Sequence, residues 1–285
     1  MTRLRRGAIG YALIAPALLV TVVFLFIPML VSGFWSFTDY NGIRPPTWVG
    51  LDNYVELLTN ARFQRAIVNT IVFVFLGMAI GPILGLATAL LLNRAIRFRS
   101  IFRTAFFLPV MTSLVVVATI WRILLNDHGL VNTLLSFVGS PGNDWLNNPY
   151  TALPSIVAAS VWQGFGFETV VFLAALQAVP RELYDAARVD GAGRWALFRH
   201  VTLPFLRPTI VFVYVIGIIG SFQVFDQIYV MTQGGPASAT RTIVFDLVDR
   251  FDSLHIGQAS AVAYMLFLVL AVLSWIQLHW LGERA

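Results

Sequence analysis

Long uninterrupted apolar runs constrain this chain more than any other feature of its sequence. Several windows of the 285 residues exceed the length needed to cross a bilayer, which is about 20 apolar residues for a helix. The composition agrees: 58% of the residues are hydrophobic, 12% are charged, and the mean hydropathy is +0.78. The runs also lack the two-residue alternation that is typical of barrel strands. The sequence therefore predicts an all-α integral membrane protein.

Six apolar runs predict six membrane-spanning helices. We place them at about 9–32, 66–92, 104–125, 151–178, 208–231 and 258–281. The stretch 49–70 predicts a short amphipathic helix that leads into the second span. A cleaved signal peptide is the alternative for the first run, but the apolar core of a signal has about 7–15 residues, and this run is roughly twice as long. Because the loops are short and no repeat has a fixed period, we expect 1–285 to form a single transmembrane domain.

The basic residues are distributed unevenly between the loops, and this predicts the orientation. Every basic side chain apart from histidine is an arginine, and most of them lie in 3–6, 94–103 and 181–207. Arginine and lysine accumulate in cytoplasmic loops of membrane proteins. This distribution predicts that both termini are cytoplasmic, as an even number of spans requires. It also explains the net charge of +5 better than nucleic-acid binding would.

Several chemistries are excluded by residues that the chain lacks. A Walker A loop needs a lysine to reach the nucleotide phosphates, and the sequence contains no lysine. It also contains no cysteine, and its four histidines are scattered without the spacing of metal ligands. We therefore expect no catalytic residue, no metal site and no cofactor bound by this chain.

A charged segment, 181–204, interrupts the apolar sequence between the fourth and fifth runs. Pro180 is expected to end the fourth span, because proline lacks an N–H. Residues 181–189 predict a short helix, Gly191 permits a left-handed turn, and 194–201 predict a second helix. Leu203-Pro204 and Pro208 are expected to redirect the chain into the fifth span. The simpler alternative is a basic loop that only fixes the topology.

The spacing in this segment resembles the EAA loop of ABC importer permeases. The pattern is Asp185-Ala186-Ala187, three residues, Gly191, nine residues, then Val201-x-Leu203-Pro204. Asp185 stands where the family has glutamate, and Val201 stands where it has isoleucine. The stretches GLDNY at 50–54, DGAGRWALFRHVTLP at 190–204, FDQIYVMTQGGP at 225–236 and GQASAVAYML at 257–266 resemble the carbohydrate-uptake branch of that family, specifically its maltose-permease-F-like members.

The resemblance implies a six-helix type I ABC importer transmembrane domain with a cytoplasmic coupling helix, in a bacterial inner membrane. It implies a permease subunit of a binding-protein-dependent sugar importer, paired with a second, related permease. The implied partners are two ATPase subunits, which would bind ATP and magnesium, and an extracytoplasmic substrate-binding protein. The residues implied to couple to the ATPase are Asp185, Ala186, Ala187, Gly191, Leu203 and Pro204.

Polar and small residues at membrane depth suggest a path for the substrate. Glu168, Gln223 and Asp226 are polar groups within apolar runs, where a charge should face protein or a water-filled cavity. Helical spacing places two sets of residues on two faces that could oppose each other. These are Gln163, Gly164 and Phe167 on one helix, and Gly217, Gly220, Ser221 and Val224 on another. The resembled family contacts sugar at equivalent positions. The alternative is that these residues only hold neighbouring helices together.

Other functions remain open at this point. One is an ABC permease for another solute, such as an amino acid, phosphate or a glycerol phosphodiester. The acids Glu168 and Asp226 argue against an anionic substrate. Another is an ion-coupled secondary transporter or channel that uses the same two acids, although the sequence shows no matching inverted halves. A membrane assembly protein without transport activity is the third.

Overall fold

The computed structural model describes residues 13–94 and 97–282. It is mostly helical, and the contacts within the chain group it into two compact units. Unit 1 comprises Met1–Asn60 and Leu247–Phe267, and unit 2 comprises Ala61–Asp246 and Leu268–Ala285. Two helices, α13 (Ile243–Asp252) and α14 (Ile256–Gly282), have residues in both units. The candidate site and the segment 181–204 belong to unit 2.

Unit 1 begins with an apolar helix, Leu13–Trp35, whose parts are η1 (Val22–Phe26) and α2 (Ile27–Trp35). A small antiparallel ribbon follows, made of β1 (Thr38–Asp39) and β2 (Thr47–Trp48). The amphipathic helix expected in 49–70 forms as α3 (Asp52–Thr59). The side-chain amide of Asn53 in α3 donates to the carbonyls of Ser36 and Thr38, both at 2.9 Å. These bonds fix α3 against the end of α2.

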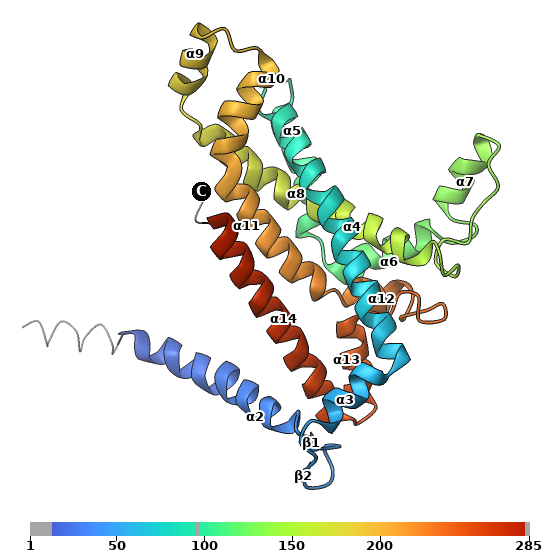
Figure 1. The fold of residues 1–285 in the computed structure, drawn as a ribbon. Coiled ribbons are helices and arrows are strands. Elements are labelled where there is room, and N and C mark those ends of the chain that lie inside the picture. The colour runs from blue at the N-terminus through green and yellow to red at the C-terminus, as the bar shows by residue number, and fades with distance from the viewer. Residues whose placement is uncertain (1–12, 95–96, 283–285) are drawn as a thin grey trace, which may run out of the picture. The chain divides into compact units, whose positions relative to one another are not determined.

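Unit 2 contains the helices that build the site. In chain order they are α4 (Ala61–Leu92), α5 (Arg99–Met111), α6 (Leu114–Leu124), α7 (Leu130–Phe137), α8 (Ala152–Ala178), α9 (Arg181–Val189), α10 (Arg194–Leu197), η2 (Phe198–Thr202), α11 (Leu203–Phe222) and α12 (Asp226–Met231). The helices α4 and α8 pack along each other, and α5 and α11 pack against this pair. Figure 1 shows α9 and α10 at one end of this bundle and α6, α7 and α12 at the other.

Two apolar clusters support the ends of the bundle in unit 2. One contains Ile156, Val157 and Ile228, which are nearly inaccessible to solvent, and it joins α4, α6, α8 and α12. The other contains Phe172 and Leu206 and joins α4, α8 and α11. The candidate site adjoins the first of these clusters, since Val157 belongs to both.

The predicted spans agree with the helices in most places. Within the described residues, five helices are long and apolar enough to cross a membrane, and a bent pair would make a sixth. The fourth span, predicted at 151–178, is α8 at Ala152–Ala178. The second span begins earlier than predicted, at Ala61. The first residues of the span predicted at 9–32 lie outside the described residues, and its helix continues to Trp35.

The span predicted at 104–125 is not one continuous helix. The structure has α5 and α6 instead, with an angle of 99° between them. Pro109 lies in the last turn of α5, where its missing N–H weakens the helix. Thr112 and Ser113 are then extended, with ψ angles of 142° and 135°. The run of apolar residues continues across this break, so hydropathy gives no sign of it.

The prediction for the fifth span, 208–231, is wrong at both ends. One helix runs from Arg194 to Phe222, so Leu203-Pro204 and Pro208 lie within it and do not redirect the chain. The π-helical turn η2 directly precedes Leu203. Its wider spacing shifts the register of the backbone hydrogen bonds just before Pro204, which has no N–H to donate. At the other end, the helix stops at Phe222, and α12 is a separate short helix.

Candidate functional site

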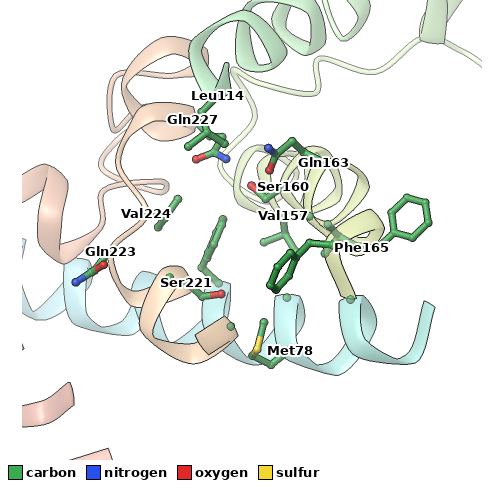
Figure 2. Close-up of a pocket in the computed structure, with 18 of the residues that line it drawn as sticks. Met78, Leu114, Val157, Ser160, Gln163, Phe165, Ser221, Gln223, Val224 and Gln227 are labelled. Carbon is green, nitrogen blue, oxygen red and sulfur yellow. The ribbon is translucent and has the colours of Figure 1, made fainter. Parts of the chain in front are cut away.

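A cavity of about 360 Å³ lies in unit 2 between α4, α8, α11 and the start of α12. Figure 2 shows Ser160 and Gln163 on the α8 wall, with Ser221 and Val224 on the wall that faces it. The sequence predicted seven pathway residues and three intramembrane polar residues, and the structure places all ten around this cavity. They are Gln163, Gly164, Phe167, Gly217, Gly220, Ser221 and Val224, with Glu168, Gln223 and Asp226. Whether substrate passes here stays a prediction.

Glycines make room for the cavity in two ways. Some allow close helix packing: a Cβ at Gly217 would lie 2.7 Å from the sulfur of Met78, and a Cβ at Gly81 would lie 3.1 Å from a carboxylate oxygen of Glu168. Others face open space, because a Cβ at Gly164 or at Gly220 would have no atom within 4 Å. The first kind holds α4 close to its neighbours, and the second leaves the walls of the cavity without side chains.

The break between α11 and α12 supplies part of the cavity wall. Gln223, Val224 and Phe225 connect the two helices and all line the cavity. Backbone without regular helix is tolerated at membrane depth only where it is buried in protein or lines a cavity. Val224 is buried, whereas Gln223 is exposed. The break therefore brings an amide side chain and non-helical backbone to the site.

Aromatic side chains give the cavity apolar faces. Phe167 remains 39% exposed, so its ring is available to a ligand. The ring of Phe165 meets Phe106 edge-on at 5.7 Å, and Phe225 stacks on Tyr229 at 5.4 Å. These contacts orient two further lining rings. The arrangement combines apolar rings with amides and hydroxyls, which is the usual chemistry of small-ligand pockets.

Sequence reasoning missed several lining residues. Ser160 lies on α8 one helical turn before Gln163 and Gly164, and the same spacing that selected those two would have found it. Gln227 follows Asp226 directly at the start of α12. Gly77 and Met78 come from α4, a helix in which no polar residue at membrane depth marked the facing side.

Glu168 is buried in the wall of the cavity, with 9% of its surface exposed. It packs against Gly81 and Gly85 of α4, since a Cβ at Gly85 would lie 2.6 Å from the Cβ of Glu168. One carboxylate oxygen, Oε2, is buried without a hydrogen-bond partner among the described residues. Glu168 thus contributes both to a helix contact and to the lining. Within the described residues, no group of three or more histidine, aspartate or glutamate side chains could hold a metal ion.

The segment 181–204, which we call the coupling segment, has the predicted turn between two helices. The first predicted helix forms as α9, and Gly191 ends it in the left-handed region with φ of +83°. The N–H of Ala192 donates to the carbonyl of Ala187 at 2.9 Å across this turn. The hydroxyl groups of Tyr184 and Thr202 are 3.0 Å apart, which ties α9 to the helix that leads into α11.

Most of the coupling segment is exposed. Asp185 and Ala186 are exposed, and so are Gly191, Leu203 and Pro204, while Ala187 is half-buried. Asp185 pairs with Arg188 at 2.9 Å, on side chains that are 68% and 63% exposed. A cavity of about 710 Å³ lies between α9, α10 and the end of α4. Most residues of α9 are exposed in the part of the chain that the structure describes.

The stretch 232–246, which we call the QGGP segment, is held by a network within unit 2. Arg241 forms an ion pair with Asp246 at 2.7 Å, and the two side chains are 3% and 0% exposed. The amide of Asn69 in α4 donates to the carbonyls of Ser238 and Arg241 at 2.8 and 2.9 Å. Thr70 accepts from the N–H of Ile243 at 2.9 Å. The segment is thereby fastened to α4.

Comparison with known proteins gives one family match. Residues 81–281 match the family model described as "Binding-protein-dependent transport system inner membrane component". Among curated relatives, the trehalose/maltose transport system permease protein MalF of Thermococcus litoralis is 34% identical over 93% of this chain and 90% of its own length. The lactose transport system permease protein LacF of Rhizobium radiobacter is 34% identical over 96% of this chain and 94% of its own.

A solved structure has the same fold. It is a chain of a bacterial alginate ABC transporter, determined in complex with a periplasmic protein that carries an alginate pentasaccharide. The TM-score is 0.86 with 27% sequence identity, and the match covers 96% of this chain and 94% of that chain.

Proposed function

Because the chain belongs to the family of binding-protein-dependent transport system inner membrane components, we propose that it is the permease subunit of an ATP-driven sugar importer. In this role it forms one half of the path for the sugar, and a second, related permease forms the other half. The observation that carries the proposal is the cavity. Residues selected from the sequence as a sugar path, on two separate helices and the loop after one of them, line one cavity.

The chemistry of the cavity supports a saccharide as cargo. The amides of Gln163, Gln223 and Gln227 can donate to and accept from sugar hydroxyls, and the hydroxyls of Ser160 and Ser221 can do the same. Exposed aromatic rings suit the apolar face of a pyranose ring. The relatives named for trehalose, maltose and lactose are consistent with this class of cargo.

The coupling segment supports an ATPase partner. We assign Asp185, Ala186, Ala187 and Gly191 to the surface that docks on the ATPase. Leu203 and Pro204 lie within the helix Arg194–Phe222, which receives its movement in this proposal. The chain has no lysine for a Walker A loop, and membership of the family supports the proposal that two separate ATPase subunits bind ATP and magnesium. In this proposal an extracytoplasmic binding protein delivers the sugar, and the arginine distribution supports a cytoplasmic position for both termini.

The direct test is to co-express the chain with the permease, ATPase and binding protein encoded beside it, and to purify the complex through a tag on this chain. We expect the ATPase and the second permease to co-purify, and we expect saccharide-loaded binding protein to stimulate ATP hydrolysis. If the chain purifies without an ATPase, or if saccharide-loaded binding protein does not raise the rate of ATP hydrolysis, the proposal is wrong.

A further inference from the structure

We infer that Glu168 makes the cavity selective by charge, so that it admits neutral or cationic saccharide units and rejects units that carry a carboxylate, such as uronates. The inference rests on the proposed function, because that function is the reason to expect a saccharide as cargo. The charge of the cavity itself can be tested without any cargo.

The first step of the argument is the position of the Glu168 carboxylate. The side chain is 9% exposed and lines the cavity, and its Oε2 has no hydrogen-bond partner among the described residues. The two carboxylate oxygens lie against α4, where a Cβ at Gly81 would be 3.1 and 3.2 Å from them. A glycine has no side chain that could donate a hydrogen bond. Oε2 is therefore buried against α4 without a partner, while the residue as a whole lines the cavity with its carboxylate charge.

The second step is the absence of a positive charge in the described lining. The charged residues that line the cavity are Glu168 and Asp226, and both are acids. Arg122 is not among the lining residues, and its guanidinium donates to the carbonyl of Val230 at 3.3 Å. The remaining polar lining side chains are neutral amides and hydroxyls. Nothing in this chain's part of the cavity neutralises an incoming anion.

The third step is the effect on different cargos. A sugar hydroxyl or an ammonium group can donate a hydrogen bond to a carboxylate, so a negative charge in the lining does not oppose it. An ionised uronate carboxylate has no proton to donate, and two like charges repel strongly in a partly buried site. A neutral sugar is thus stabilised where an acidic sugar is opposed. The cargo we expect therefore differs in charge from that of the solved transporter of similar fold, which is involved in the import of the acidic polysaccharide alginate.

The absence of cysteine from the chain allows a clean measurement of the charge in the cavity. We would introduce Ser221→Cys as a reporter inside the cavity and Ser136→Cys as a reference on the exposed face of α7. Each is carried by the purified transport complex, with any cysteines of the partner chains replaced. Its modification rates are measured with a cationic and an anionic methanethiosulfonate reagent.

Relative to the reference, we expect the Ser221→Cys reporter to prefer the cationic reagent about tenfold, since a charge a few ångströms away in a partly buried site has an effect of this order. Adding Glu168→Gln keeps the shape and removes the charge, and should abolish most of this preference. Asp226→Asn is the matched control and should change it less. An unchanged preference in Glu168→Gln, or a larger loss in Asp226→Asn, would overturn the assignment to Glu168.

A second measurement connects the charge to cargo. Binding of maltotriose and of trigalacturonate to the complex would be compared by equilibrium dialysis. We expect Glu168→Gln to raise the ratio of trigalacturonate to maltotriose binding at least about fivefold. An unchanged ratio would overturn the inference. If neither saccharide binds while the reagent preference follows Glu168, the sugar in the proposed function is wrong, but the charge of the cavity stands.

Discussion

The QGGP segment and the coupling segment both join apolar helices and both contain an ion pair, yet they are stabilised in opposite ways. In the QGGP segment, Arg241 and Asp246 are almost completely buried and pair with each other, and α4 supplies hydrogen bonds to its backbone. In the coupling segment, the pair of Asp185 and Arg188 is about two-thirds exposed.

The apolar side chains of the two segments also differ in exposure: some are largely exposed in the coupling segment, and some are buried in the QGGP segment. Val189 and Trp195 of the coupling segment are 88% and 70% exposed, whereas Ile243 and Phe245 of the QGGP segment are buried. A stretch whose polar and apolar groups are satisfied by its own chain needs no partner. Exposed apolar residues beside charges mark a surface that another protein covers. Burial thus distinguishes the QGGP segment, which completes the fold, from the coupling segment, which we propose docks on the ATPase.

The largest expected effect is on the buried ion pair. Arg241→Met should lower the free energy of unfolding by about 3–5 kcal/mol, because it leaves the carboxylate of Asp246 buried without its counter-ion. Thermal unfolding of the purified complex in detergent would measure this. Replacing both partners, as in Arg241→Met with Asp246→Leu, should recover much of the loss. A single variant as stable as the parent would contradict the assigned role of the pair.

The second prediction concerns the turn of the coupling segment. Gly191→Val should reduce sugar uptake more than about tenfold, because a β-branched residue at φ of +83° is strained by at least about 1–2 kcal/mol and displaces α9. The matched control is Gly193→Val: Gly193 has φ of −74°, and a Cβ at either glycine meets no atom within 4 Å. Uptake and co-purification of the ATPase would be measured for both. Equal effects of the two variants would mean that backbone strain is not the cause.

The third prediction concerns selectivity. Changing Gln163, Phe167 and Ser221 to alanine should alter the relative uptake of different sugars about fivefold or more, as expected from the loss of one or more hydrogen bonds. Assembly with the ATPase should be unaffected, because none of the three lies in the coupling segment. Uptake that keeps both its rate and its selectivity would show that these residues do not border the path.

The smallest expected effect is on the exposed pair. Arg188→Met should change the free energy of unfolding by less than about 1 kcal/mol, since exposed ion pairs contribute little. Measured beside Arg241→Met in the same assay, it sharpens the comparison between the two segments. A loss of stability equal to that of Arg241→Met would remove the distinction on which the comparison depends.

Sequence reasoning succeeded where the pattern reflects local helix geometry. The bounds of α8, the helix over 181–189 and the turn at Gly191 follow from periodicity, proline and glycine, and the structure confirms them. The ten predicted residues around the cavity were found from helical spacing and from polar groups in apolar runs. Ser160 was missed although the same spacing included it.

Sequence reasoning failed where the backbone breaks inside an apolar run or where contacts are distant in sequence. The bend after Pro109 and the end of α11 at Phe222 are not marked by hydropathy, because apolar residues resume beyond each break. The network of the QGGP segment depends on Asn69, which bonds a residue 172 positions away. No local pattern connects such partners.

The most direct test of the account is uptake into proteoliposomes. We expect radiolabelled sugar to enter only when this chain is reconstituted with its second permease, its ATPase and sugar-loaded binding protein, with ATP and magnesium supplied on the ATPase side. Omitting ATP should stop uptake. Sugar that enters through this chain alone, without nucleotide, would contradict the claim that force generated in a separate chain reaches the cavity through the coupling segment.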